Sequence, residues 1–405
     1  MVRINEERLK ENILALGEIG KVPEGGVTRK AFTQEDIVGR EYTASLMEEA
    51  GCRVKVDAAG NLIGYLPGKD RTLPSIMIGS HIDTVPQGGL FDGAIGVLGG
   101  IECLKVFKEE KYKPDHPIEV VAFSAEEGSA LGGTFGSRAM AGQIDPADLT
   151  SPQKRIMDAN LKVFGLSFEK IKEAKRDPET IKSFLEMHIE QGSILEELKV
   201  PIGIVFGIVG IFRYEVTVKG EANHSGSTPM AKRDDALIKA SRMVLAVEEF
   251  VNEESSSMVG TVGSMQVTPN AINVIPGEVK MTVEFRDINA WDPILVYERL
   301  RQFGSELGGV TFKKIVEKEP VRLHPGIQEK ISQACDDTEI CYHKMASAAG
   351  HDAVAMSYLA PTSMIFVPSR RGISHAPEEW TEWEDVFAGT NVLMRTVLAI
   401  DKNNE

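Results

Sequence analysis

Residues 79–96, GSHIDTVPQGGLFDGAIG, place a histidine and two aspartates among five glycines, directly after the apolar run SIMIG at 75–79. A continuous apolar run is typical of a strand that is buried on both faces. The polar residues His81, Asp83 and Asp92 then follow where ordinary turn residues would be enough to end the strand. Imidazole and carboxylate groups are metal-type ligands. The stretch therefore predicts an α/β sheet with chemistry at the carboxyl ends of its strands.

Composition limits the classes of function. The chain has 405 residues, 42% of them hydrophobic, which favours two domains over one. The net charge of −15 repels nucleic-acid phosphates and anionic lipids. The first twenty residues form a charged amphipathic pattern, and no apolar run reaches the length of a membrane span. We expect a soluble cytoplasmic protein that binds neither nucleic acid nor membrane.

The N-terminal part alternates helix and strand signals. Residues 32–51 predict a helix in which Thr33 caps the start, Asp36 follows three residues later, and Gly51 marks the end. The apolar runs SIMIGS (75–80) and IEVVAFS (118–124) predict buried strands. Buried strands separated by helices indicate an α/β sheet.

The pattern of predicted elements changes near residue 211, where alternating strands replace continuously apolar ones. The expected elements are an alternating strand at 212–220, a helix at 234–254, a hairpin at 273–287 that turns at Pro276-Gly277, and a helix at 292–307. This is a compact β-α-β-β-α unit. After residue 324 the chain returns to helices and the apolar strand TSMIFVPS (362–369). We therefore expect a discontinuous domain at 1–210 and 324–405, with 211–323 inserted into it.

Three of the eight histidines follow short apolar or strand-like runs, and carboxylates lie near the same places. The residues are His81, His188, His375, Asp83, Asp92, Glu126 and Glu127. Neutral imidazole and carboxylate are the usual ligands of catalytic zinc and related metals, and two metals close together need a shared carboxylate. Asp92 is the candidate for that shared ligand. His81 and His188 would complete one set, and Glu127 and His375 the other.

Two further carboxylates have expected roles beside the ligands. Asp83 lies two residues after His81 on an extended chain, so its side chain would face the same way and accept a hydrogen bond from the imidazole. Glu126 and Glu127 are adjacent after a buried strand, where unpaired acids are costly. Neighbouring side chains on an extended backbone point to opposite sides. One glutamate would then bind metal while the other acts as general base.

Five segments together resemble the dimetal aminoacylase and carboxypeptidase family of zinc peptidases. They are GSHIDT (79–84), FDG (91–93), EEG (126–128), HIEQG (188–192) and ISHAPEEW (373–380). The likeness spans nearly the whole chain and is greatest to the branch of N-carbamoyl-L-amino-acid hydrolases and allantoate amidohydrolases. It implies an α/β, mixed-sheet, metallopeptidase-like catalytic domain with an inserted α+β, ferredoxin-like lid or dimerisation domain.

The resemblance also implies roles for single residues. His81, Asp92, Glu127 and His375 match the family's metal ligands, and Glu126 matches its general base. His188 stands where many peptidases of the family have an acid, as in the carbamoylase branch. The implied cofactor is two divalent ions per subunit, and zinc, manganese, cobalt and nickel all suit such ligands.

Substrate-binding positions follow from the same resemblance. They are Gln191, His224, Asn273, Arg286 and Gly350. The planar fork of Arg286 suits bidentate capture of an α-carboxylate. Gly350 would donate its backbone N–H to the same group. His224 would polarise the scissile carbonyl from the partner subunit of a homodimer.

The implied reaction is hydrolysis of the ureido C–N bond of an N-carbamoyl-L-amino acid to the amino acid, carbon dioxide and ammonia. Allantoate amidohydrolase is the alternative, and the small, glycine-rich residues 128–133 leave side-chain specificity open. His188 argues against an aminoacylase or dipeptidase. The intact Glu126 and the full ligand set argue against a non-catalytic binding protein.

Overall fold

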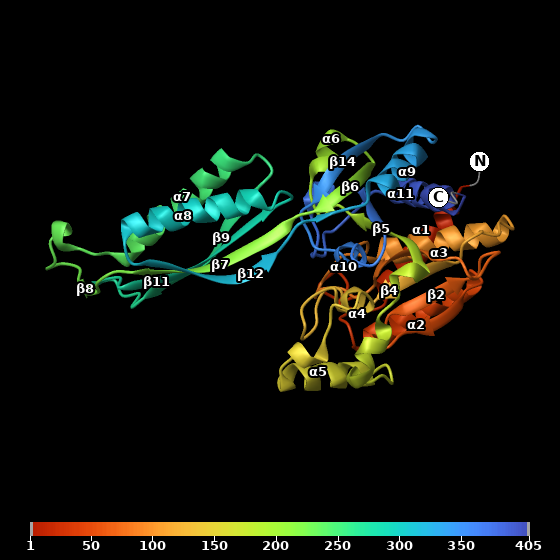
Figure 1. The fold of residues 1–405 in the computed structure, drawn as a ribbon, viewed down its shortest axis with the longest axis horizontal. Coiled ribbons are helices and arrows are strands. Elements are labelled where there is room, and N and C mark those ends of the chain that lie inside the picture. The colour runs from red at the N-terminus through yellow and green to blue at the C-terminus, as the bar shows by residue number, and fades with distance from the viewer. Residues whose placement is uncertain (1–2, 403–405) are drawn as a thin grey trace. The chain divides into compact units, whose positions relative to one another are not determined.

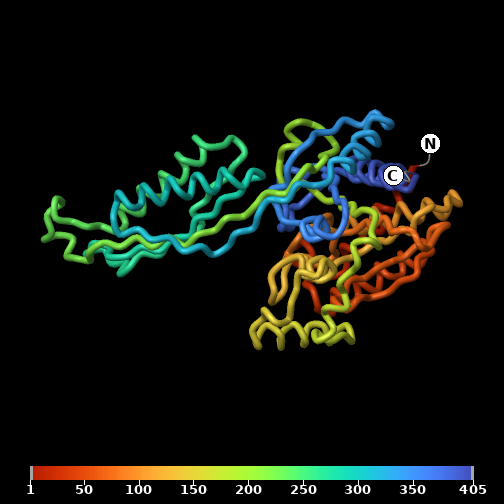
Figure 2. Tube along the Cα trace, viewed as in Figure 1, coloured from red at the N-terminus to blue at the C-terminus, as the bar shows by residue number. Residues whose placement is uncertain are grey.

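The computed structural model describes residues 3–402, and the chain divides into two compact units. Unit 1 is Met1–Phe206, Leu323–Met345 and Ala349–Glu405, and unit 2 is Gly207–Arg322 and Ala346–Ala348. In Figure 2 the red and orange segments and the dark blue C-terminal segment belong to unit 1, whereas the chain of unit 2 runs from green to cyan. Unit 1 is thus discontinuous in sequence.

The larger sheet has nine strands among the described residues and is mixed. The strands are β1 (Arg53–Val56), β2 (Leu62–Leu66), β3 (Ser75–His81), β4 (Ile118–Phe123), β5 (Ile181–Ile189), β6 (Ile202–Ile208), β13 (Val321–Arg322), β14 (Tyr342–Ser347) and β15 (Thr362–Val367). Their order is β1-β2-β4-β3-β5-β15-β6-β13, with β14 paired to β6. The α/β class predicted from the sequence is confirmed.

The centre of this sheet is parallel. β3 runs parallel to β4 and to β5, and β5 runs parallel to β15. Every residue of β3 and β4 is buried, which confirms the two strands predicted from continuous apolar runs. Because parallel strands end at the same edge, the segments that follow β3, β4, β5 and β15 meet there.

Helices flank this sheet (Figure 1). They are α1 (Glu6–Glu18), α2 (Gln34–Glu49), α3 (Ala94–Glu109), α4 (Phe135–Met140), α5 (Ser151–Lys162), α6 (Ile194–Leu198), α9 (Pro325–Asp336), α10 (Asp352–Met356) and α11 (Trp383–Asp401), with 3₁₀ turns η1 (Pro146–Asp148), η2 (Phe168–Ala174), η3 (Pro178–Thr180) and η5 (Arg370–Gly372). Thr33 caps α2 by accepting from the N–H of Asp36, as predicted. Within residues 3–402, no helix is long and apolar enough to cross a membrane.

α3 lies close to the sheet because its glycines leave no side chain in the way. A Cβ on Gly96 would lie 2.4 Å from the carbonyl oxygen of Met187 and 2.9 Å from Cβ of Ser80. A Cβ on Gly100 would lie 2.9 Å from Cγ2 of Ile78. These glycines therefore bring the helix that follows Asp92 against β3 and β5.

Unit 2 holds a four-stranded antiparallel sheet in the order β12-β7-β11-β9. Its elements are β7 (Gly210–Lys219), β8 (Asn223–His224), η4 (Met230–Lys232), α7 (Ala236–Glu254), β9 (Val259–Thr268), β10 (Val274–Ile275), β11 (Glu278–Asp287), α8 (Trp291–Leu307) and β12 (Val310–Lys318). Figure 1 shows α7 and α8 on one face of this sheet. The four main strands and two helices follow the β-α-β-β-α-β order of a ferredoxin-like unit. Its role as a lid or dimerisation domain stays a prediction.

The prediction of a hairpin at 273–287 is wrong, because the two strands of this segment pair with other strands. β11 pairs with β9, which the sequence did not reveal, and Glu278 lies opposite Thr268. The short β10 pairs with β8 instead. β9 was missed because most of its residues are exposed and it contains Gly260 and Gly263, so its apolar alternation is weak.

Candidate metal centre

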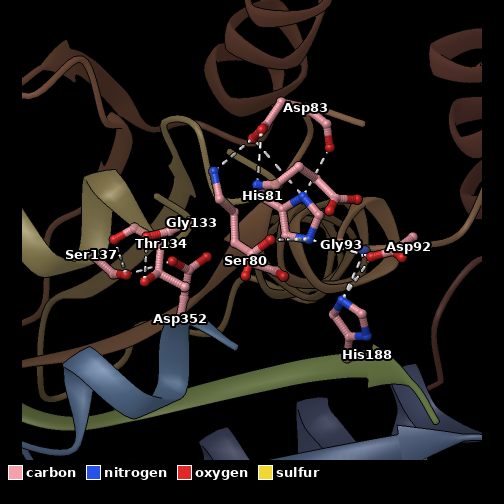
Figure 3. A network of polar contacts seen from close by, with 12 residues as sticks. Ser80, His81, Asp83, Asp92, Gly93, Gly133, Thr134, Ser137, His188 and Asp352 are labelled. Atoms are coloured by element: carbon pink, nitrogen blue, oxygen red, sulfur yellow. Dashed lines mark hydrogen bonds and ion pairs between the residues drawn. The ribbon is translucent and has the colours of Figure 1, made fainter. Parts of the chain in front are cut away.

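The predicted ligands of unit 1 gather at the edge where the parallel strands end. Figure 3 shows His81, Asp92 and His188 there. His81 is the last residue of β3, and His188 is the last but one of β5. Glu126 and Glu127 follow β4, and His375 follows β15. Asp92 lies just before α3. Sequence segments far apart are thus brought to one place by the topology of the sheet.

The first ligand group is His81, Asp92 and His188, and all three are buried. Oδ1 of Asp92 lies 3.4 Å from Nε2 of His81 and 3.1 Å from Nε2 of His188. Atoms that bind one tetrahedral ion at ~2.0–2.1 Å are about 3.3 Å apart. The spacing therefore fits three ligands of one ion.

Hydrogen bonds set the tautomers of the two histidines. Nδ1 of His81 lies 2.9 Å from the carbonyl oxygen of Asp83, and Nδ1 of His188 lies 2.9 Å from that of Ile189. A carbonyl only accepts, so both Nδ1 atoms carry protons and both Nε2 atoms present lone pairs. The N–H of Gly93 donates to Nε2 of His188, which requires a lone pair on that nitrogen and agrees with this tautomer. A carboxylate oxygen and two imidazole nitrogens that face one another in a buried place are a donor set suited to a metal ion.

The second group is Asp92, Glu127 and His375. Nε2 of His375 lies 3.2 Å from Oδ2 of Asp92 and 3.5 Å from Oε2 of Glu127. Oε1 of Glu127 is buried and has no hydrogen-bond partner within residues 3–402. The hydrogen bond to Asp92 raises the pKa of His375 to about 9. Asp92 thus turns one oxygen to each group, which is the arrangement of a bridging carboxylate.

Asp83 does not hold His81 by its carboxylate. The carboxylate oxygen Oδ1 lies 4.0 Å from Nδ1 of His81, and the main-chain carbonyl of Asp83 takes the hydrogen bond instead. The carboxylate accepts from the backbone N–H of Glu126 at 3.2 Å and of Glu127 at 3.1 Å. Asp83 therefore accepts from His81 as expected, but through its main-chain carbonyl oxygen. The prediction of a side-chain acceptor is wrong, because the carboxylate is hydrogen-bonded to two backbone N–H groups.

The two adjacent glutamates lie in a bend and not on a strand. β4 ends at Phe123, and Ala125 has a positive φ of 53°. Oε2 of Glu126 lies 3.6 Å from Nε2 of His81, whereas Glu127 faces His375. The side chains of Glu126 and Glu127 thus face different groups, as predicted. The physical cause is the bend and not the alternation of side chains along a strand. Burial raises the pKa of Glu126 well above its usual value.

Gln191 lies against the second ligand group. Its Nε2 donates to Oδ2 of Asp92 at 2.9 Å and lies 3.4 Å from Nε2 of His375. Its backbone has a positive φ of 59°, and its N–H donates to Oγ of Ser369. Gly350 stands in open surroundings, since a Cβ there would meet no atom within 4 Å.

Three predicted substrate residues belong to unit 2. His224 on β8 lies opposite Val274, which brings Asn273 beside it, and both His224 and Asn273 are exposed. Nδ1 of His224 accepts from two backbone N–H groups, so its proton is on Nε2. Nε of Arg286 donates to Glu284 at 2.8 Å.

Several residues around the ligands were not predicted. Glu186 on β5 accepts from Oγ of Ser80, next to His81, and from the N–H of Ala353. Figure 3 shows Asp352 beside Ser137 in the same network. Glu186 lies two residues before His188 on a strand, so both side chains share one face of it. That spacing was the available signal for Glu186.

Comparisons with known proteins show which family the chain belongs to. A model of peptidase family M20/M25/M40 matches residues 77–399. The chain is 39% identical over 404 residues to an N-carbamoyl-L-amino acid amidohydrolase of Geobacillus stearothermophilus, which covers 97% of this chain and 98% of that protein. It is 32% identical over 413 residues, 97% of each chain, to the allantoate amidohydrolase of Escherichia coli (strain K12).

A solved structure shares the whole fold. The crystal structure of an amidase of the hydantoinase/carbamoylase family from Burkholderia multivorans superposes with a TM-score of 0.89 at 34% identity, over 99% of both chains. The residues matched by the family model include every ligand candidate from His81 to His375. The chain is therefore a member of peptidase family M20/M25/M40.

Proposed function

We propose that the protein is a metal-dependent amidohydrolase that cleaves the ureido C–N bond of N-carbamoyl-L-amino acids to the amino acid, carbon dioxide and ammonia. The observation that carries the proposal is the position of Asp92, whose Oδ1 faces His81 and His188 while its Oδ2 faces His375. The substrate class is supported by the name of the Geobacillus stearothermophilus relative.

Two divalent ions per subunit suit the two ligand groups. His81, Asp92 and His188 would hold one, and Asp92, Glu127 and His375 the other. Zinc, manganese, cobalt and nickel all accept such imidazole and carboxylate ligands. When bound, the ions polarise a carbonyl group and lower the pKa of water.

Glu126 is the proposed general base. It would take a proton from the attacking water as oxygen adds to the ureido carbon, and give a proton to the departing nitrogen as the C–N bond breaks. If the departing nitrogen is that of the amino acid, the carbamic acid that remains decomposes to carbon dioxide and ammonia. If ammonia departs first, the N-carboxy amino acid that remains decomposes to carbon dioxide and the amino acid. The raised pKa of the partly buried Glu126 carboxyl suits an acid that must both accept and release a proton.

His188 fits a ureido substrate better than a peptide. A neutral imidazole in place of a carboxylate leaves Asp92 and Glu127 as the anionic ligands, so more positive charge remains on the metal pair. A ureido carbonyl is a poorer electrophile than a peptide carbonyl and needs that stronger polarisation.

The substrate's α-carboxylate is the proposed partner of Arg286, with Gln191, Asn273 and the backbone of Gly350 as further contacts. Glu284 and the carbonyl oxygen of Ala348 already orient the guanidinium, at 2.8 and 2.9 Å. A fixed planar fork suits bidentate capture of a carboxylate, because little conformational freedom remains to be lost on binding.

We propose a homodimer in which His224 reaches the partner's substrate and polarises the ureido carbonyl. The Nε2–H of His224 is the donor that this role requires. A small-molecule ureido substrate and a cytoplasmic location complete the proposal.

Allantoate is the second candidate substrate. It also carries ureido groups and a carboxylate, and the Escherichia coli relative is an allantoate amidohydrolase. Residues 128–133 after the glutamate pair are glycine-rich, which leaves the side-chain specificity open.

Assays on metal-reconstituted protein test the function. The panel contains N-carbamoyl-L-amino acids with small, aliphatic, aromatic and acidic side chains, allantoate, an N-acetyl amino acid and a dipeptide. Turnover of the carbamoyl compounds, lost on chelation and restored by a divalent ion, is expected. Exclusive turnover of allantoate would establish the second candidate, and turnover of the dipeptide alone would overturn both.

A further inference from the structure

Glu379 is a buried acid whose carboxylate accepts hydrogen bonds from the backbone at Asp92. It follows His375 by four residues in the sequence, and only 3% of its surface is exposed. Its Oε1 accepts from the N–H of Phe91 at 3.0 Å and from the N–H of Asp92 at 3.1 Å. One carboxylate oxygen thereby fixes two successive peptide groups at the proposed bridging ligand.

The other oxygen of Glu379 reaches the side chain of Asp92 through Ser374. Oγ of Ser374 lies 2.9 Å from Oε2 of Glu379 and 3.0 Å from Oδ2 of Asp92, and its single proton is donated to one of these two oxygens at a time. Ser374 also precedes His375, a ligand candidate of the second group. Glu379 therefore connects with Asp92 at its backbone and its carboxylate, and the connection runs through the segment that carries His375.

Gly89 makes room for this carboxylate. A Cβ on Gly89 would lie 1.9 Å from Oε1 of Glu379, a separation that no side chain tolerates. Space for Glu379 thus depends on Gly89, which lies within the glycine-rich residues 79–96.

The partners of Glu379 are uncharged. They are two backbone amides and one hydroxyl. The charged groups that interact with it are the carboxylate of Asp92 and, on the same segment, the imidazole of His375. Burying one carboxylate beside another costs free energy. A residue that only packs two segments together would not need to be an acid. An amide or an apolar side chain would tether the two segments at less cost. The arrangement is therefore better explained by what it does to Asp92.

We propose that Glu379 is a positioning residue that holds the Asp92 carboxylate so that its two oxygens face the two ligand groups. Oε1 of Glu379 binds the backbone N–H of Asp92, and Oδ2 of Asp92 contacts Ser374. Oδ1 of Asp92 then faces His81 and His188. Rotation of the carboxylate would break these contacts. This inference rests on the proposed dimetal function, and Glu379 itself touches neither substrate nor reacting atoms.

The test compares three variants with the wild-type protein. Glu379→Gln keeps the shape but gives Ser374 a donor in place of an acceptor, and Gly89→Ala displaces the carboxylate without removing any hydrogen-bonding group. Glu378→Gln is the matched control, because Glu378 is the adjacent acid and is exposed. Each metal-free protein is titrated with Mn²⁺ while free Mn²⁺ is followed by electron paramagnetic resonance, and its Tm is measured without metal.

We expect two Mn²⁺ per chain in the wild type and in Glu378→Gln. In Glu379→Gln and Gly89→Ala, the Kd of at least one ion should rise by about tenfold or more, as for other residues that orient metal ligands. An unchanged Kd for both ions in Glu379→Gln, whether or not its Tm falls, would overturn the positioning role and leave a structural tether. A wild type that binds fewer than two ions would instead overturn the dimetal function itself.

Discussion

The carboxylate of Asp83 accepts a hydrogen bond from the main-chain N–H of Glu126 at 3.2 Å. Its other oxygen accepts from Glu127, and its own carbonyl oxygen faces Nδ1 of His81. A single buried residue therefore sets the ring orientation of a ligand candidate and the bend that carries the proposed base. The end of β3 and the loop after β4 are positioned together.

Replacing Asp83 with Asn should separate these effects. The amide has one acceptor oxygen, so only one of the two backbone N–H groups keeps its partner, while the main-chain contact to His81 remains. We expect kcat on the preferred substrate to fall by roughly 10–100-fold with metal still bound, as for other residues that orient a metal site. Metal analysis and steady-state kinetics check this. An unchanged kcat would show that the bend holds without Asp83.

Glu126→Gln tests the assignment of the base. The variant removes the proton acceptor and keeps the shape, so kcat should fall by about 10²–10⁴-fold while metal content stays at the wild-type value. Inductively coupled plasma analysis and kinetics on the same preparation give both quantities.

Glu127→Gln is the matched change at the neighbouring position. Because Glu127 faces His375, this variant should lose metal. If metal is lost from the Glu126 variant and retained in the Glu127 variant, the two roles are reversed.

Residues at the edge of the parallel sheet could be predicted from the sequence because strand ends carry their own signal. His81, His188 and Asp92 each follow or flank an apolar run, and the parallel order of β3, β4, β5 and β15 brings such ends together. The same logic accounts for the predicted start of α2 at Thr33, where a local hydrogen bond decides the structure.

Contacts that depend on tertiary approach could not be predicted. The carboxylate of Asp83 serves backbone groups 43 and 44 residues away, and the exposed strand β9 is held by its neighbour β11 and not by an apolar pattern of its own. Glu379 accepts from groups 287 and 288 residues away. Its only local signal was its place in the ISHAPEEW motif.

Arg286→Lys should mainly weaken substrate binding. Lysine replaces a planar fork by a point charge and loses the contact between Nε and Glu284 that orients the side chain. We expect KM for a carbamoyl amino acid to rise by about tenfold or more with a smaller change in kcat. Arg213→Lys is the control, because Arg213 bonds the same glutamate from β7. Equal effects in the two variants would remove Arg286 from the substrate site.

Asp36 should make the stability of the protein fall with rising pH. Burial raises the pKa of this carboxyl to about 6, against roughly 3.9 in the unfolded chain. The folded state therefore binds the proton more tightly, and up to ~3 kcal/mol of the free energy of unfolding is lost between about pH 4 and pH 6. Urea unfolding of Asp36→Asn and wild type across this range should show the variant gaining relative stability as pH rises. The comparison variant Glu35→Gln should show the opposite trend, because hydrogen bonds from the backbone and from Thr33 lower the pKa of Glu35 in the folded state.

Subunit exchange tests whether His224 acts across a dimer. The two inactive variants His224→Ala and Glu126→Gln are mixed and allowed to exchange, and native mass spectrometry measures the mixed dimers. In a mixed dimer, one site can combine the intact metal ligands and base of the first chain with the intact His224 of the second. The other site carries both defects.

Random 1:1 exchange makes about half of the dimers mixed, and half of the sites in each are complete, so activity should recover to about a quarter of the wild-type value. If His224 acts within its own chain, every site keeps one defect and mixing restores nothing. Exchange without recovery would therefore refute the role in trans. A protein that stays monomeric throughout would refute it as well, because each chain would then have to supply its own His224.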